Sequence, residues 1–138
     1  MKVVSACLAG RNCRYDGKSK PNQVIMELVE QGKALPVCPE ELGGLGTPRI
    51  EAEQQGDRVV TKEGRDVTEG FKKGANLAYE LASQVGSKEA ILKARSPSCG
   101  CGKVYDGTFT GKLKEGDGVF AKLLKSKGFK ILTEEDLQ

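Results

Sequence analysis

The sequence predicts a protein of the α/β class: a small, mostly parallel sheet with helices on both faces, Rossmann-like in arrangement. Short apolar segments typical of strands alternate with segments of helical periodicity, in the order β-α-β-loop-α-β-loop-α-β. The first strand, helix and strand follow one another within a few residues, which favours parallel strands joined by a crossover helix. The length of 138 residues favours a single domain that spans residues 1–138.

The first half of the chain contains a βαβ unit followed by an irregular segment. Residues 2–7 are an apolar strand, residues 21–31 carry apolar side chains at helical spacing, and residues 34–37 form the second strand. Three glycines and a proline in residues 40–49 argue against a regular element there. Residues 50–67 have the turn signals of a small hairpin.

The second half repeats the alternation of helix and strand. A long helix with a polar cap is expected over about residues 66–86, followed by a strand over residues 90–93. Residues 104–111 are rich in turn formers and are expected to be a short extension around the site. A helix over residues 118–127 and a strand over residues 129–132 complete the order.

Three cysteines stand at the ends of predicted strands. Cys7 ends the first strand, Cys38 follows the second, and Cys99 lies in a Ser-, Pro- and Gly-rich loop after the third. Ligands of open parallel sheets bind outside the carboxyl ends of the strands, so we expect these three thiols to share one site. Cys13 lies in a polar loop and lacks this placement. Either Cys99 or Cys101 could occupy the site, and we prefer Cys99 because it is nearer to the strand end.

The composition excludes several classes of function. The chain has no histidine, which excludes Cys–His nucleophile pairs, Ser–His–Asp triads and histidine-based zinc sites. A net charge of +3 without a Lys/Arg run, together with 5% aromatic residues, does not favour stable nucleic-acid binding. No apolar run approaches the ~20 residues of a membrane span, and no signal peptide is recognised. We therefore expect a cytoplasmic protein with no membrane contact; the sequence does not indicate an oligomeric state.

Five cysteines in a cytoplasmic protein indicate metal binding or thiol chemistry rather than disulfides. Three thiolates without histidine fit two kinds of metal site: zinc with an open fourth position, or an iron–sulfur cluster with three protein ligands and one free iron. The residues alone leave both open. We favour the cluster, because ligands from three separate strand ends can surround a group larger than one ion.

Two polar residues close to these cysteines are candidates for proton transfer or substrate orientation. Glu40 stands two residues after Cys38. It is either a proton donor or acceptor in the same cleft, or an ordinary solvated acid or helix cap. Ser96 either orients a substrate atom or bonds the local backbone. A mixed-charge rim that could bind a polar heterocycle, or could simply be solvated, comprises Arg14, Asp16, Lys18 and Arg49.

Seven short motifs occur together and in order along the chain. They are Val4-Ser-Ala-Cys-Leu8, Cys13-Arg-Tyr-Asp-Gly17 with Lys18, Pro36-Val-Cys-Pro-Glu40, Gly44-Leu-Gly-Thr-Pro-Arg49, Gly64-Arg-Asp-Val-Thr68, Ser96-Pro-Ser-Cys-Gly100 and Tyr105-Asp-Gly-Thr-Phe109. In this combination the chain resembles the thiouracil desulfidase family, formerly a bacterial domain family of unknown function. The resemblance covers essentially the whole chain.

The resemblance implies a [4Fe-4S] cluster held by Cys7, Cys38 and Cys99, the same three residues that the strand ends select. It implies removal of sulfur from a small thiolated uracil-type base without net redox change, with the substrate sulfur on the open iron and release of sulfide and uracil. The acid–base glutamate and the assisting serine of the family fall on Glu40 and Ser96.

Two other classes of function remain as alternatives. One is a zinc-binding or persulfide-handling sulfur carrier in which Cys99 and Cys101 form a thiol pair. The other is a non-catalytic module that binds modified nucleotides, for which the mildly basic charge is the only support.

Overall fold

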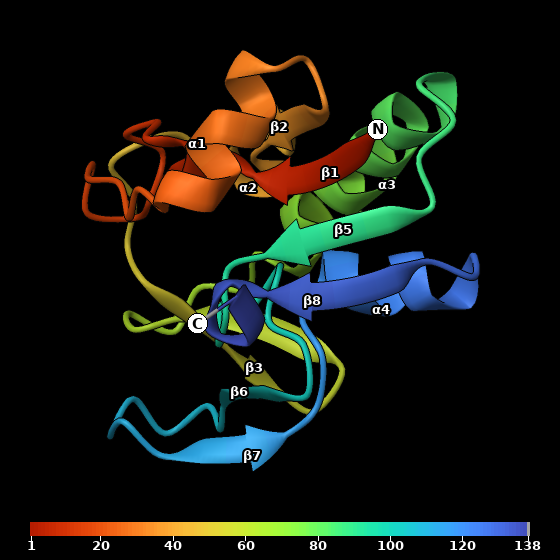
Figure 1. Cartoon of the computed structure of the whole chain (residues 1–138). Helices are drawn as coiled ribbons and strands as arrows, with labels where there is room; N and C mark the ends of the chain where they lie inside the picture. The colour runs from red at the N-terminus through yellow and green to blue at the C-terminus, as the bar shows by residue number, and fades with distance from the viewer. Residues whose placement is uncertain (138) are drawn as a thin grey trace.

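The centre of the molecule is a sheet of four parallel strands. The structure is a computed structural model that describes residues 1–137. The strands are β1 (Lys2–Ser5), β2 (Ala34–Val37), β5 (Glu89–Leu92) and β8 (Lys130–Thr133), in the spatial order β2-β1-β5-β8 (Figure 1). β1 therefore lies between β2 and β5. Because the chain builds first to one side of β1 and then to the other, the sheet has a switch point between β1 and β5, where ligand clefts form.

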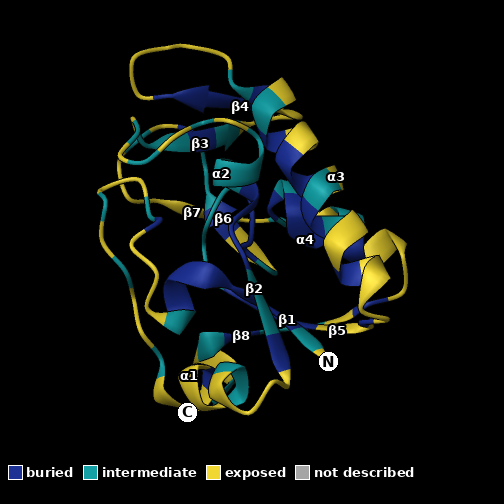
Figure 2. Cartoon of the chain, turned by 90° about the horizontal axis from the view of Figure 1, so that it is seen from above, coloured by how far each residue is buried: buried dark blue, intermediate teal, exposed yellow. Residues whose placement is uncertain are grey.

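Helices cover both faces of this sheet, as the sequence predicted. α1 (Gln23–Glu30) packs on one face, and α3 (Thr68–Gln84) and α4 (Val119–Ser126) pack on the other (Figure 1). α3 has buried residues along one side and exposed residues along the other, which is the pattern of an amphipathic surface helix (Figure 2). The α/β class with a parallel sheet is confirmed.

The core divides into two clusters because successive strand residues point to opposite faces. Val3 and Leu92 pack with Phe120 of α4, whereas Val4 packs with Ile25 of α1. All five of these side chains are fully buried. Burial of each such side chain contributes about 1.5–3 kcal/mol, so the sheet and the helices on its two faces are held together mainly by this packing.

Two antiparallel hairpins lie outside the parallel sheet. The first joins β3 (Ala52–Gln55) to β4 (Arg58–Thr61), and the second joins β6 (Lys103–Tyr105) to β7 (Leu113–Glu115). The hairpin expected within residues 50–67 is therefore confirmed. Both hairpins lie below the sheet in Figure 1, next to the ends of the strands that carry the predicted site.

Two local predictions were wrong. The strand expected over residues 2–7 ends at Ser5, and a 3-10 helix, η1 (Ala6–Ala9), carries Cys7. The segment expected to be irregular begins with a short helix, α2 (Pro39–Leu42), whose first residue is a proline in a favourable position.

The glycines of the α2 region serve packing. A Cβ at Gly43 would collide with the carbonyl oxygen of Gly70, and a Cβ at Gly74 with that of Pro39. These glycines let α2 lie directly against α3, which fixes the position of α2. None of the helices in residues 1–137 is both long and apolar enough to cross a membrane.

Candidate functional site

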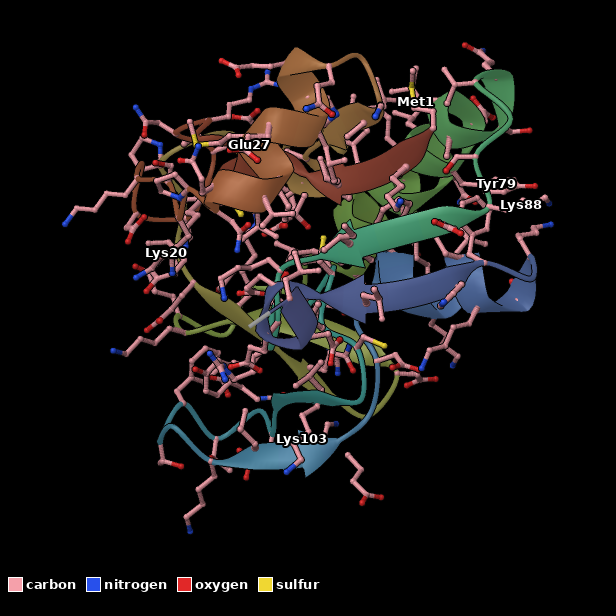
Figure 3. The ribbon with its side chains drawn as sticks, viewed as in Figure 1. Met1, Lys20, Glu27, Tyr79, Lys88 and Lys103 are labelled. Atoms are coloured by element: carbon pink, nitrogen blue, oxygen red, sulfur yellow. The ribbon has the colours of Figure 1, made fainter. Side chains whose placement is uncertain are left out.

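A cavity of about 380 Å³ lies at the carboxyl end of the parallel sheet. Met1 and Lys88 mark the opposite, amino end of the sheet in Figure 3. Four of the five cysteines line the cavity, and all four are buried: Cys7, Cys13, Cys38 and Cys99. The remaining cysteine, Cys101, is partly exposed and lies outside the residues that line the cavity.

The three cysteines selected from the sequence come from three neighbouring strands. Cys7 follows β1 in η1, Cys38 follows β2 directly as the N-cap of α2, and Cys99 lies in the loop after β5. The register pairs Ser5 of β1 with Val37 of β2, so the segments that follow these two strands carry Cys7 and Cys38 at the same edge of the sheet. The structure thus brings Cys7, Cys38 and Cys99 into one cavity.

Cys13 is a fourth thiol in the cavity that sequence reasoning left out. Its loop folds back on η1, where the Lys20 N–H donates to the Cys7 carbonyl oxygen at 2.9 Å. The Cys38 thiol lies 3.7 Å from the Cys13 carbonyl oxygen, and the ligand atoms of Cys13, Cys38 and Glu41 lie within 4.8 Å of one another. These contacts join residues that are far apart in sequence, so the polar composition of the loop did not indicate that Cys13 would lie in the cavity.

The four buried thiols differ in acidity. The pKa of Cys38 is lowered, first because its ionised sulfur accepts a hydrogen bond from the Cys13 thiol, and this bond raises the pKa of Cys13. Burial raises the pKa of Cys7 to about 11, although the charge of Lys93 opposes the shift, and burial also raises that of Cys99. A metal bound by Cys7 and Cys99 would therefore displace the protons of these thiols near neutral pH.

Glu40 lines the cavity from the first turn of α2 and is held by Arg49. The Arg49 Nη2 donates to the Glu40 Oε2 at 2.8 Å, and the two side chains are only 10% and 14% exposed. Arg49 is fixed in turn because its Nη1 donates to the Gly46 carbonyl oxygen and to the Thr47 hydroxyl. Arg49, expected on a charged rim, is instead the partner of the candidate acid–base residue.

Ser96 also lines the cavity, and its hydroxyl supports the loop that carries Cys99. The Ser96 Oγ accepts hydrogen bonds from the backbone N–H groups of Ser98 at 3.2 Å and Cys99 at 3.1 Å. Bonding to local backbone, one of the two interpretations made from the sequence, is therefore observed. Its hydroxyl proton is left to donate to another acceptor.

Lys93 is a residue of the cavity that the sequence did not single out. Its Nζ lies 2.8 Å from the Glu134 Oε2, and the Glu134 Oε1 accepts the Ala94 N–H at 2.7 Å. The backbone N–H of Lys93 donates to the Ser5 hydroxyl at 2.9 Å. A lysine after a buried strand gave no signal of this role, because its partner lies at the far end of the chain.

The donor set of the cavity fits an iron–sulfur cluster. The buried cysteine thiols are soft ligands that suit the iron of such clusters, and the chain has no histidine that could supply an imidazole ligand. Thiols from three strand ends surround a space of about 380 Å³, rather than meeting at one tight turn as zinc-ribbon ligands do.

Comparison with known proteins agrees with this geometry. A family model described as 2-thiouracil desulfurase matches residues 3–136. The uncharacterized protein YbbK of Bacillus subtilis (strain 168) is 42% identical, with 99% of this chain and 97% of that protein covered. A solved structure described as [4Fe-4S]-dependent thiouracil desulfidase TudS is 46% identical and superposes with a TM-score of 0.94, covering 99% of this chain and 91% of that one. The chain belongs to the 2-thiouracil desulfurase family.

Proposed function

We propose that this chain is an enzyme that removes sulfur from thiolated uracil-type bases, with a [4Fe-4S] cluster held by Cys7, Cys38 and Cys99. The observation that carries the proposal is that these three buried thiols line one cavity at the ends of three neighbouring strands. Family membership and the likeness to the TudS structure support the same activity.

The net reaction exchanges the sulfur of a C=S group for the oxygen of water. Water attacks the ring carbon, the C–S bond breaks, and sulfide leaves with the protons of that water, so no atom changes its oxidation state. A cluster held by Cys7, Cys38 and Cys99 would supply a soft Lewis acid, which would polarise the C=S bond of the substrate.

Glu40 is proposed to accept the proton of the attacking water. It lines the cavity that holds the thiols, and Arg49 orients its carboxylate through a bond of 2.8 Å. The second oxygen of the carboxylate is not engaged in that bond and can face the water. A positioned carboxylate base contributes about 10²–10⁴ in rate.

Ser96 and Lys93 are proposed to assist at the same cavity. The Ser96 hydroxyl oxygen accepts hydrogen bonds from two backbone N–H groups, so the hydroxyl can use its O–H to donate a hydrogen bond to the substrate. The Lys93 ammonium, held by Glu134, places a positive charge near Cys7. That charge favours the thiolate form of Cys7.

Cys13 is proposed to act as a hydrogen-bond donor to the Cys38 sulfur, outside the ligand set. Its place beside Cys38 and the direction of their pKa values support this role. Three ligands leave one iron open for substrate, whereas a fourth thiolate would fill that position.

The test is anaerobic reconstitution followed by iron and sulfide analysis and an assay with 2-thiouracil. We expect a visible absorption band near about 400 nm, as clusters give, and equal amounts of uracil and sulfide as products. A colourless protein that binds zinc or carries persulfide would favour the sulfur carrier. Absence of turnover with retained binding of modified RNA would favour the nucleotide-binding module.

A further inference from the structure

One wall of the cavity belongs to the second hairpin and carries no thiol. Tyr105 at the end of β6 and Phe109 in the loop before β7 line the cavity together with the cysteines. In Figure 1 this loop lies below the sheet, at the left, which is the side toward which the strand arrows point. The proposed function gives neither aromatic residue a role in holding a cluster or in moving a proton, so their place in the cavity wall is still unexplained.

Phe109 has an unusual backbone conformation. Its φ is 57°, in the left-handed region that bulky residues rarely adopt, and Arg95 is the other non-glycine residue with positive φ among those that the structure describes. Such a conformation is energetically unfavourable for a residue with a bulky side chain and persists only where the surroundings enforce it. The fold therefore keeps the Phe109 backbone in an unfavourable conformation at the wall of the cavity.

The group that enforces this conformation is the buried carboxylate of Glu53. Its Oε1 accepts the backbone N–H groups of both Gly107 at 3.0 Å and Phe109 at 3.1 Å, and the residue is only 9% exposed. The Gln55 amide donates to the Gly107 carbonyl oxygen at 2.9 Å. A Cβ at Gly107 would collide with the Gln54 carbonyl oxygen, so only glycine permits this close approach. Hydrogen bonds from the first hairpin thus fix the backbone of the loop between β6 and β7 in the second hairpin.

From this geometry we infer that Phe109 is the surface on which the planar ring of the substrate base stacks, and that Glu53 is its positioning residue. The inference rests on the proposed function for the kind of substrate. An aromatic side chain on a fixed backbone beside a cavity offers a face on which a flat heterocycle can stack, and the entropic cost is low because the loop does not have to be ordered on binding. Phe109 then selects cyclic, planar thiolated bases over acyclic thioureas.

The test measures the affinity of the reconstituted protein for uracil by calorimetry, together with iron content and the turnover of 2-thiouracil and thiourea. Phe109→Ala is expected to weaken uracil binding about 10- to 100-fold, the range for loss of one base–aromatic stack. It should raise KM for 2-thiouracil and lower the preference for 2-thiouracil over thiourea, with iron content unchanged. Phe109→Trp keeps a π face and should retain uracil binding, whereas Phe109→Leu should not.

Glu53 is tested by two substitutions. Glu53→Ala leaves the N–H groups of Gly107 and Phe109 unpaired and should weaken uracil binding as Phe109→Ala does, while Glu53→Gln keeps an acceptor oxygen and should restore it. Leu113→Ala, which removes an exposed apolar side chain from the same hairpin, is the matched control and should change nothing.

Uracil affinity separates this inference from the proposed function, because it is measured whether or not the protein turns over thiouracil. Unchanged uracil affinity in Phe109→Ala, or equal losses in Phe109→Trp and Phe109→Leu, would overturn the stacking role. Wild-type protein that binds no uracil would also overturn it. Iron loss in Phe109→Ala would show that the residue supports the cluster site instead.

Discussion

The Arg49 guanidinium lies 2.8 Å from the Glu40 carboxylate inside the cavity that four cysteines share. Both side chains are largely buried, so solvent screens their interaction much less than that of a surface ion pair. Arg49 approaches from the loop after α2, whereas Glu40 belongs to α2 itself. This pair lies beside the thiols and leads to the first two predictions.

Glu40→Gln is predicted to keep the cluster and to slow turnover of 2-thiouracil by about 10²–10⁴, because the amide cannot take the proton of water. The amide oxygen still accepts from Arg49, so the local structure is retained. Iron content and kcat are measured on the same preparation. Near-normal kcat with full iron would show that Glu40 has only a structural part.

Arg49 is predicted to act through Glu40 and not on the substrate directly. Arg49→Met should therefore lower kcat in the wild-type background but have little further effect in the Glu40→Gln background. The non-additivity of the double-mutant cycle is the measured quantity, since residues that act as a unit give coupled losses. Fully additive losses would assign Arg49 an independent role.

The order of thiol alkylation in cluster-free protein is predicted from the pKa directions. Cys38 and Cys7 are equally exposed at 7%, so access does not separate them. The pKa of Cys38 is lowered from its ordinary value, so its reactive thiolate is present at lower pH; that of Cys7 is raised to about 11, so its thiolate forms only as pH approaches that value.

Iodoacetamide labelling followed by mass spectrometry between pH 7 and pH 9 (roughly the range around an unperturbed thiol pKa) should therefore mark Cys38 before Cys7. Cys13→Ala removes the hydrogen-bond donor to the Cys38 sulfur and should move the reactivity of Cys38 to higher pH. Equal labelling of the two thiols in the unsubstituted chain would refute the proposed Cys13–Cys38 bond.

The two cysteines outside the proposed ligand set are predicted to be dispensable for iron. Cys13→Ser and Cys101→Ala should each keep iron content and turnover close to those of the unsubstituted protein. Cys101 lies outside the residues that line the cavity, and Cys13 is assigned a donor role. Iron loss in Cys13→Ser would place Cys13 among the ligands and leave no open iron.

The sequence predicted those parts of the fold and site that depend on local patterns. Apolar runs gave the parallel strands, and a thiol at or after a strand end needs no tertiary information to be placed at the sheet edge, which is why Cys7, Cys38 and Cys99 were found. A glycine in the sequence can either break a helix or allow two helices to pack closely, and the sequence around Gly43 and Gly74 does not distinguish the two. The helix α2 was therefore missed.

The rest of the site depends on contacts between residues far apart in sequence. Cys13 reaches the cavity through a loop that folds back on η1, and Lys93 is held by Glu134, 41 residues further along. Glu53 and Phe109 meet only because the two hairpins pack together. Neither periodicity nor motif spacing predicts such contacts, because they form only when the whole chain has folded.

If the thiols of Cys7, Cys38 and Cys99 hold a catalytic cluster, the iron content of single cysteine variants must depend on each of them. We expect anaerobically reconstituted Cys7→Ser, Cys38→Ser and Cys99→Ser each to lose the cluster and the release of sulfide from 2-thiouracil, while Cys101→Ala retains both. Iron loss in Cys101→Ala with full iron in Cys99→Ala would contradict the assignment at that loop. Full iron and turnover in any one of the three serine variants would contradict the claim itself.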